Sequence, residues 1–340
     1  MRTSDFEYDL PAGLIAQAPA APRDSSRLLV LKRTSGSLAH HLFRDLPDLL
    51  HPDDVLVLNE TRVLPARLHA RKIPTGGRIE LLLLRRPAPQ TWEVLVGGKG
   101  LAPGRRLQVE GGPEAEILQD LGGPRRLVRF HEPISPRLQE IGEMPLPPYI
   151  HTPLRDPEEY QTVFAREPGS AAAPTAGLHF TPDLLDRIRS RGIEIAFVTL
   201  HVGLDTFAPV DEEDPGKHRI HTEWCRVAQA AAEAVNAARA RGGRVVAVGT
   251  TATRTLETAA RLAPPGLAVA PFEGATDLFI LPGHTFRAVD ALITNFHLPR
   301  STLLMLVCAF AGRERVLAAY ESAKASGYRF YSFGDAMFIV

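Results

Sequence analysis

Side chains that can bind anions or transfer protons gather in four short segments, each beside an apolar run. In one of them, Asn295, His297 and Arg300 lie between the apolar residues 291–293 and the apolar run 303–310. This order predicts a buried strand, a polar turn and a buried helix, and such turns are open to a ligand between two rigid elements. The four segments are residues 174–180, 199–203, 248–254 and 291–302.

The segment 248–254 predicts an anion site at the start of a helix. Gly249 follows an apolar strand and lets the backbone turn, and Thr250, Thr251 and Arg254 open the next helix. Backbone amides at a helix N-terminus bind carboxylate or phosphate, and threonine hydroxyls add donors. No Gly-Lys-Ser/Thr or Gly-x-Gly-x-x-Gly pattern is present, which disfavours a P-loop and a hydride-transfer dehydrogenase. The alternative is a capped helix that binds no ligand.

Five histidines recur close to predicted strand ends or turns: His179, His201, His218, His221 and His297. No His-Glu-x-x-His and no paired Cys-x-x-Cys occurs, so we expect no metal site. Neutral imidazoles can instead donate hydrogen bonds or transfer protons, although each one could also have a purely structural role. Asp205, Asp277 and Asp335 are candidate acids near turns, and the absence of Gly-x-Ser-x-Gly disfavours a serine hydrolase.

The elements that must position these side chains alternate between strands and helices. A mixed-sheet α/β main domain is therefore expected. The expected strands are residues 27–32, 54–59, 193–202, 244–248, 289–294, 328–333 and 336–340. The expected helices begin at Thr181-Pro182-Asp183 (ending at Gly192), span 227–241, follow Gly249, and span 301–311.

Residues 62–130 carry a different pattern, with six short β segments separated by Gly and Pro turns. Many short β segments with closely spaced turns predict a small inserted all-β, barrel-like domain. A proline-rich stretch, residues 132–157, then suits an extended return linker. We expect a discontinuous α/β catalytic domain from residues 1–61 and 149–340, and an inserted domain with its linker from residues 62–148.

Charge is distributed unevenly along a chain whose formal net charge is zero. Residues 62–130 contain 13 Arg or Lys and 6 Asp or Glu. This excess of positive charge is typical of a surface that binds nucleic acid. The alternative is that the basic side chains lie on exposed strand edges and prevent these edges from pairing with other chains. The chain has only two cysteines and no apolar leader, and its apolar run at 303–310 is too short to span a bilayer. We therefore expect a cytoplasmic protein without a membrane partner.

Several motifs in a fixed order resemble the S-adenosylmethionine:tRNA ribosyltransferase-isomerase family of queuosine biosynthesis. The resemblance covers almost the whole chain. Arg300 stands where the family commonly has Lys, and Ala275 where an aromatic residue is common. The matching motifs are residues 6–11, 15–17, 23–29, 59–63, 65–68, 172–180, 200–203, 206–207, 209–210, 218–223, 249–251, 291–312 and 328–339.

The resemblance implies transfer of the ribosyl part of S-adenosylmethionine, not its methyl group. The acceptor would be the 7-aminomethyl-7-deazaguanine base at the tRNA wobble position, and the products epoxyqueuosine-tRNA, adenine and methionine. S-adenosylmethionine would be a co-substrate, with no prosthetic group and no metal. The family fold, an α/β domain with an inserted β-barrel, agrees with the pattern above, and we expect a monomer.

Site residues are assigned on the same resemblance. His179, His201 and His221 are the candidates for proton transfer. The candidate tRNA-binding side chains are Arg62, Arg67, Lys99, Arg105 and Arg106. The candidate substrate-binding residues are Thr175, Gly249, Thr250, Thr251, Arg254, Asp277, Asn295, His297 and Arg300.

Two other functions remain open on the residues alone. A non-catalytic tRNA-binding protein would share the basic insert but would not need the polar segments of the α/β part. A methyltransferase using S-adenosylmethionine would release S-adenosylhomocysteine rather than adenine and methionine.

Overall fold

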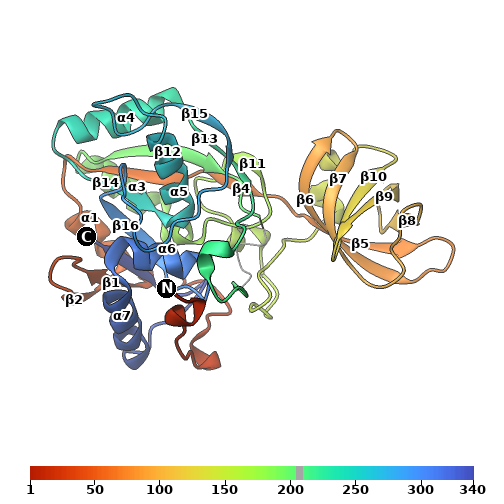
Figure 1. The fold of residues 1–340 in the computed structure, drawn as a ribbon, viewed down its shortest axis with the longest axis horizontal. Coiled ribbons are helices and arrows are strands. Elements are labelled where there is room, and N and C mark those ends of the chain that lie inside the picture. Colours follow the sequence, from red (N-terminus) through yellow and green to blue (C-terminus); the bar gives the residue numbers. More distant parts are fainter. Residues whose placement is uncertain (204–209) are drawn as a thin grey trace. The chain divides into compact units, whose positions relative to one another are not determined.

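The computed structural model describes residues 1–203 and 210–340, which form two compact units (Figure 1). One unit comprises Met1–Arg62, Pro148–Glu167 and Ala173–Val340, and the other comprises Val63–Pro147 and Pro168–Ala172. The sequence predicts domain boundaries at 61/62 and 148/149. The difference lies mainly in Pro168–Ala172, which belong with the second unit.

A nine-stranded mixed sheet forms the centre of the first unit, in the order β15-β13-β12-β3-β14-β16-β17-β1-β2. Its inner strands β12, β3, β14 and β16 run parallel, whereas β17 is antiparallel to β16 and parallel to β1. The strands are β1 (Arg27–Leu31), β2 (Leu38–Leu42), β3 (Val55–Asn59), β12 (Glu194–Leu200), β13 (Glu223–Val227), β14 (Val245–Val248), β15 (Phe272–Thr276), β16 (Ala291–Asn295) and β17 (Ala336–Ile339).

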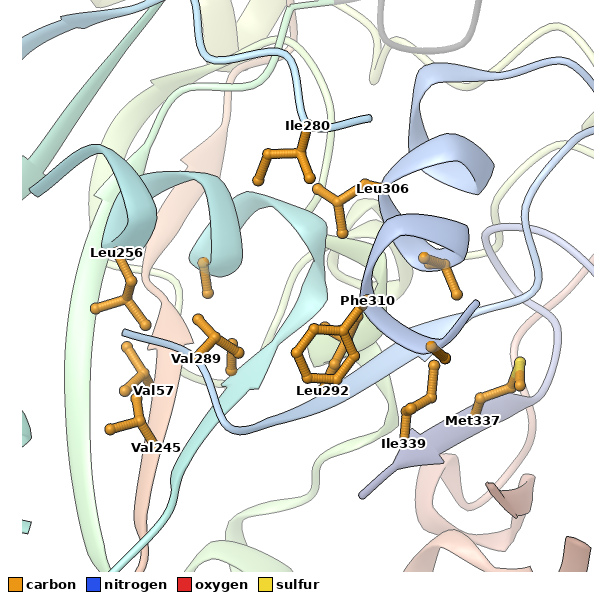
Figure 2. Packing of buried hydrophobic residues seen from close by; sticks show 14 of the residues in the cluster. Val57, Val245, Leu256, Ile280, Val289, Leu292, Leu306, Phe310, Met337 and Ile339 are labelled. Atoms are coloured by element: carbon orange, nitrogen blue, oxygen red, sulfur yellow. The ribbon is translucent and has the colours of Figure 1, made fainter. Parts of the chain in front are cut away.

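Apolar side chains cover both faces of this sheet, because successive residues of a strand point to opposite sides. On β3, Val55 and Val57 join one core cluster, and Leu56 and Leu58 join another. The first cluster packs under α4 (Gln229–Ala240), α5 (Gly249–Ala260), α6 (Thr302–Ala311) and α7 (Arg313–Ala325), as Figure 2 shows in part. The second packs under α1 (Leu46–Leu49) and α3 (Pro182–Ser190).

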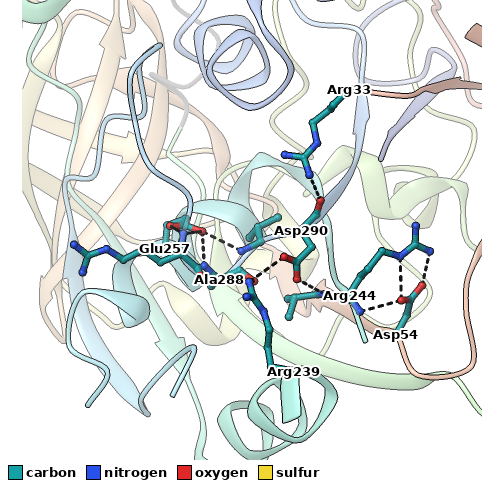
Figure 3. A network of polar contacts seen from close by, with 10 residues as sticks. Arg33, Asp54, Arg239, Arg244, Glu257, Ala288 and Asp290 are labelled. Carbon is teal, nitrogen blue, oxygen red and sulfur yellow. Dashed lines mark hydrogen bonds and ion pairs between the residues drawn. The ribbon is translucent and has the colours of Figure 1, made fainter. Parts of the chain in front are cut away.

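Buried carboxylates fix the loops at the ends of the inner strands (Figure 3). Glu257 on α5 is 2% exposed and accepts from the backbone amides of Arg287, Ala288 and Val289 at about 3.0–3.1 Å. Asp54, fully buried before β3, accepts from the Arg244 side chain and backbone before β14. These bonds fix the segments that lead into β3, β14 and β16 and tie α5 to the residues before β16.

The second unit contains a closed six-stranded barrel in the order β10-β7-β6-β5-β8-β9. Alternate residues of β7, including Trp92, Val94 and Val96, point into its core. The short helix α2 (Leu138–Ile141) adds Leu138 to the same core, so part of the expected linker packs on the barrel. The barrel strands are β5 (Arg67–Lys72), β6 (Arg78–Ala88), β7 (Thr91–Gly97), β8 (Arg106–Val109), β9 (Glu114–Gly122) and β10 (Arg125–Phe130).

The fold class is confirmed: a large mixed sheet with helices, and a small closed barrel. One expected element was wrong, because residues 328–333 form only an isolated bridge at Phe330, and Tyr331 has a φ of 70°, which no strand accommodates. The sequence patterns also missed β2, β13, β15 and α7, together with the two-stranded sheet of β4 (Thr61–Val63) and β11 (Glu167–Ser170). No helix in the described residues has the length and apolarity needed to cross a membrane.

Candidate functional site

A pocket lies where β14 and β16 end and α5 begins, and we call it the threonine pocket. Gly249 opens α5 with a φ of 88°, a conformation that favours glycine. Thr250 and Thr251 follow, and Asn295 and His297 come from the turn after β16. The lining residues are Ala173, Pro174, Thr175, Ala176, Val202, Gly249, Thr250, Thr251, Thr294, Asn295, His297 and Leu303.

The threonine pocket has the features of an anion site. The backbone amides of the first turn of α5 have no partner within the helix, and no side chain caps the helix. Thr251 is 8% exposed, and its hydroxyl has no hydrogen-bond partner among the described residues. A buried hydroxyl without a partner costs free energy, which a ligand accepting its hydrogen bond would remove.

A second pocket, which we call the arginine pocket, lies beside the first and shares Leu303 with it. Its polar residues include a buried ion pair between Arg254 of α5 and Glu223 of β13. Thr251 and Arg254 are three residues apart, so they lie on neighbouring turns of one helix face. The lining residues are Gly203, His218, Ile220, His221, Glu223, Arg254, Leu278, Phe279, Ile280, Thr302, Leu303 and Leu306.

His179 is buried and lines neither the threonine pocket nor the arginine pocket. Its Nδ1 bonds to the Ser26 hydroxyl at 2.8 Å, its Nε2 faces the Asn295 amide nitrogen at 3.3 Å, and its ring stacks on Phe43. Asn295 also donates to the carbonyl of Tyr331 at 3.1 Å. The imidazole therefore orients Asn295, which does line the threonine pocket.

His297 lines the threonine pocket through a fixed ring. Its Nε2 lies 2.7 Å from the Thr294 hydroxyl, and its backbone amide donates to the Tyr320 hydroxyl. Burial lowers the pKa of His297 to about 3, and burial together with nearby Arg329 and Arg23 lowers the pKa of His179 to about 3. Both imidazoles are neutral at pH 7.

Buried neutral histidines make the fold sensitive to acid. Unfolded histidine has a pKa near 6.5, so between about pH 6.5 and 3 the unfolded chain binds more protons than the folded one. We expect each of His179 and His297 to lower the free energy of unfolding by about 2 kcal/mol at pH 5 relative to pH 7.5. Urea titrations at both pH values measure the loss. His297→Gln should make it smaller, the exposed control His151→Gln should not, and an equal loss in all three proteins contradicts the assignment.

The other two candidate histidines occupy different surroundings. His201 Nδ1 bonds to the Thr61 hydroxyl at 2.8 Å, and its ring stacks on Trp224 with centroids 5.0 Å apart. Burial lowers its pKa, and it lines neither pocket, although the next residues Val202 and Gly203 do. His221 is exposed at the wall of the arginine pocket.

Three other candidates lie away from the two pockets. Arg300, with a φ of 54°, directs its guanidinium to Glu7 at 3.6 Å. Asp277 is exposed after β15, and Asp335 accepts from the backbone amides of Arg27 and Arg329, a structural role. Asp205 and the motif residues Thr206, Phe207 and Pro209 lie outside the described residues.

The candidate tRNA-binding side chains divide by their partners. Arg62, Arg67 and Arg106 form ion pairs with Glu158, Glu80 and Glu114 respectively. Lys99 is exposed, Arg105 is half-buried, and neither meets a carboxylate in the part of the chain that the structure describes.

Sequence patterns missed the carboxylate of Glu223 and the apolar residues Leu278, Phe279 and Ile280 as members of a pocket. Glu223 is recognisable in the sequence as part of the motif 218–223 and as a carboxylate close to His218 and His221. Among residues 1–203 and 210–340 no group of His, Cys, Asp and Glu side chains is arranged to hold a metal ion.

Comparison with known proteins gives consistent matches over the full chain. The model of the family described as "Queuosine biosynthesis protein" matches residues 3–339. Curated relatives named S-adenosylmethionine:tRNA ribosyltransferase-isomerase are 56% identical in Symbiobacterium thermophilum and 52% in Staphylococcus haemolyticus, each over 100% of both chains.

A solved structure agrees with these matches. The crystal structure of S-adenosylmethionine tRNA ribosyltransferase from Thermotoga maritima is 40% identical and covers 99% of this chain and 100% of its own, with a TM-score of 0.58. The two-unit architecture, the polar turns after β14 and β16, and these matches lead to one assignment: the chain belongs to the queuosine biosynthesis protein family.

Proposed function

We infer that this protein is a transferase that moves and isomerises the ribosyl part of S-adenosylmethionine onto tRNA in queuosine biosynthesis. We propose that the acceptor is the 7-aminomethyl-7-deazaguanine base at the wobble position, giving epoxyqueuosine-tRNA, adenine and methionine. S-adenosylmethionine serves as co-substrate. We propose further that the protein acts as a cytoplasmic monomer without a prosthetic group.

The observation that carries the proposal is the threonine pocket at the start of α5. The methionine part of S-adenosylmethionine bears a carboxylate, which suits unpaired amides at the positive end of a helix dipole. The buried Thr251 hydroxyl supplies one further donor. Asn295 directs its amide nitrogen to His179 and the Tyr331 carbonyl, and its carbonyl oxygen accepts from the Thr175 hydroxyl at 3.5 Å, which fixes this part of the pocket wall.

The chemistry requires a base, a site for adenine and an uncharged amine. The sulfonium makes the ribose 5′ protons acidic, so a base can remove one to give an ylide whose collapse expels adenine. The tRNA amine then adds, and closure of the epoxide expels methionine. An alkyl amine is protonated at neutral pH, so the site must also help to deprotonate it.

We propose His221 and His201 for the proton transfers and His179 for positioning Asn295. His221 is accessible at a pocket wall, and no hydrogen bond engages Nε2 of His201 among the described residues. His179 has both ring nitrogens engaged and its pKa lowered to about 3, so it is a poor carrier of a proton near pH 7.

The basic insert supports recognition of the anticodon arm through phosphate contacts. Lys99 and Arg105 have no carboxylate partner among the described residues, so their charges are available to RNA. We expect Lys99→Ala/Arg105→Ala to weaken tRNA binding and to lower the slope of log K against log salt by about 2, one for each lost contact. Filter binding between 50 and 300 mM salt, roughly the range in which such slopes are measured, gives both quantities.

A matched control removes two basic side chains from the α/β unit, Lys32→Ala/Arg261→Ala. These residues are exposed and form no ion pair in the described part of the chain. The control should keep the wild-type slope. Equal slopes for wild type and Lys99→Ala/Arg105→Ala would remove Lys99 and Arg105 from the tRNA-binding surface.

Product analysis tests the function directly. The purified protein is incubated with S-adenosylmethionine and tRNA carrying the precursor base, and small products are separated by chromatography. Equal amounts of adenine and methionine are expected. S-adenosylhomocysteine would indicate a methyltransferase, and the absence of any product would indicate a protein that only binds tRNA.

A further inference from the structure

The arginine pocket combines an apolar wall with a polar one. Leu278, Ile280 and Leu306 are at most 2% exposed, and Phe279 is half-buried. Figure 2 shows Ile280 and Leu306 close together, the first after β15 and the second on α6. Together with Leu303 they line a shallow apolar hollow that opens to solvent. Such a wall suits a flat ring system better than a charged group.

Charges in this pocket are already balanced. The Arg254 guanidinium pairs with the Glu223 carboxylate, both side chains being more than nine-tenths buried, and Arg254 Nε donates to the Leu278 carbonyl at 3.0 Å. The Nδ1 atom of His218 lies 2.8 Å from the Oε2 atom of Glu212. The His218 ring contacts the Phe279 ring edge-on, with centroids 5.7 Å apart. A second anion would gain little from Arg254, because Glu223 neutralises it.

One donor of Arg254, a residue that lines the pocket, has no acceptor among the described residues. Arg254 Nη2 is buried and has no hydrogen-bond partner among the described residues. A buried guanidinium N–H without an acceptor is costly, so a ligand that offers one is favoured. A neutral heteroaromatic ring with an in-plane nitrogen offers this donor an acceptor and can pack against the apolar wall as well.

The two pockets are adjacent. Leu303 lines both, and the consecutive residues Val202 and Gly203 line one pocket each. Along α5, Arg254 lies about 4.5 Å beyond Thr251, since each residue rises 1.5 Å. A ligand with a carboxylate at one end and a neutral purine at the other can therefore occupy both.

We propose that the arginine pocket binds the adenine ring of S-adenosylmethionine, with Arg254 donating to a ring nitrogen and Phe279 contacting the ring, while the methionine end lies in the threonine pocket. This inference rests on the proposed function, in that S-adenosylmethionine is the ligand. It fixes the direction of S-adenosylmethionine along α5 and assigns Phe279 and Arg254 to purine recognition.

Calorimetric titration of adenine and of L-methionine, each alone, into the full chain tests the direction. Phe279→Ala should weaken adenine binding at least about fivefold, as expected for the loss of an aromatic contact to a base, and leave methionine binding unchanged. Thr251→Val removes a hydroxyl at nearly constant volume and should weaken only methionine. Phe272→Ala is the matched control, since Phe272 is also half-buried against the same core but lines neither pocket, and it should change neither affinity.

Three results would overturn the proposal: no adenine binding to the wild type, unchanged adenine affinity in Phe279→Ala, or weaker methionine binding in Phe279→Ala. The proposed function is judged separately, by release of adenine and methionine from the wild type with tRNA. If the titrations give the expected results but adenine and methionine are not released, the purine site stands and the ribosyl transfer is wrong.

Discussion

Replacing His221 by alanine lowers turnover by about 10²- to 10⁴-fold, the usual contribution of a group that transfers a proton in the transition state. The side chain is exposed at the arginine pocket, so its removal should change the free energy of unfolding by less than about 0.5 kcal/mol. Single-turnover release of adenine measures the rate, and binding of S-adenosylmethionine is measured alongside. We expect kcat to fall far more than the affinity.

His151→Ala serves as control, because His151 is also exposed in the α/β unit and lines neither pocket. It should retain wild-type turnover. If His221→Ala does so too, His221 has no part in proton transfer and His201 becomes the remaining candidate.

Arg254→Ala should destabilise the protein by about 3 kcal/mol, because it removes the guanidinium from a buried ion pair. Glu223, 7% exposed, then stays in a low-dielectric site without that cation, and the Leu278 carbonyl loses a donor. Urea denaturation followed by circular dichroism gives the difference. The loss of stability comes mainly from leaving the carboxylate desolvated, and less from losing the net stabilisation that the ion pair provides.

The double variant Arg254→Met/Glu223→Gln separates these two contributions. Glutamine can still accept from the Gly203 amide, which now donates to Glu223 at 2.8 Å. The double variant should recover more than half of the lost stability while still binding adenine weakly. A double variant no more stable than Arg254→Ala would show that the apolar replacement cannot fill the site.

Much of the architecture could be predicted because local patterns determine it. The barrel strands alternate buried and exposed residues between Gly and Pro turns, and the strand-turn-helix segments around Gly249 and Asn295 carry clear boundaries. Since β14 and β16 are parallel neighbours, their carboxyl ends meet, and Thr251 and His297 share a pocket as a result.

Other features depend on contacts that no local pattern contains. Arg254 meets Glu223 across α5 and β13, 31 residues apart, and β13 itself was missed. Burial of His179 follows from stacking on Phe43, which lies far away in the sequence. Arg300 points to Glu7 rather than into a pocket because the N-terminal residues pack beside it.

The sheet order has a consequence for how the chain is made. β17 lies between β16 and β1, so β1 and β2 join the rest of the sheet only through Ala336–Ile339. During synthesis β1 leaves the ribosome about 300 residues before this partner. One edge of β1 therefore stays unpaired while the barrel and the inner strands form. Any interruption of translation before residue 336 would leave two unpaired strand edges, which are templates for aggregation.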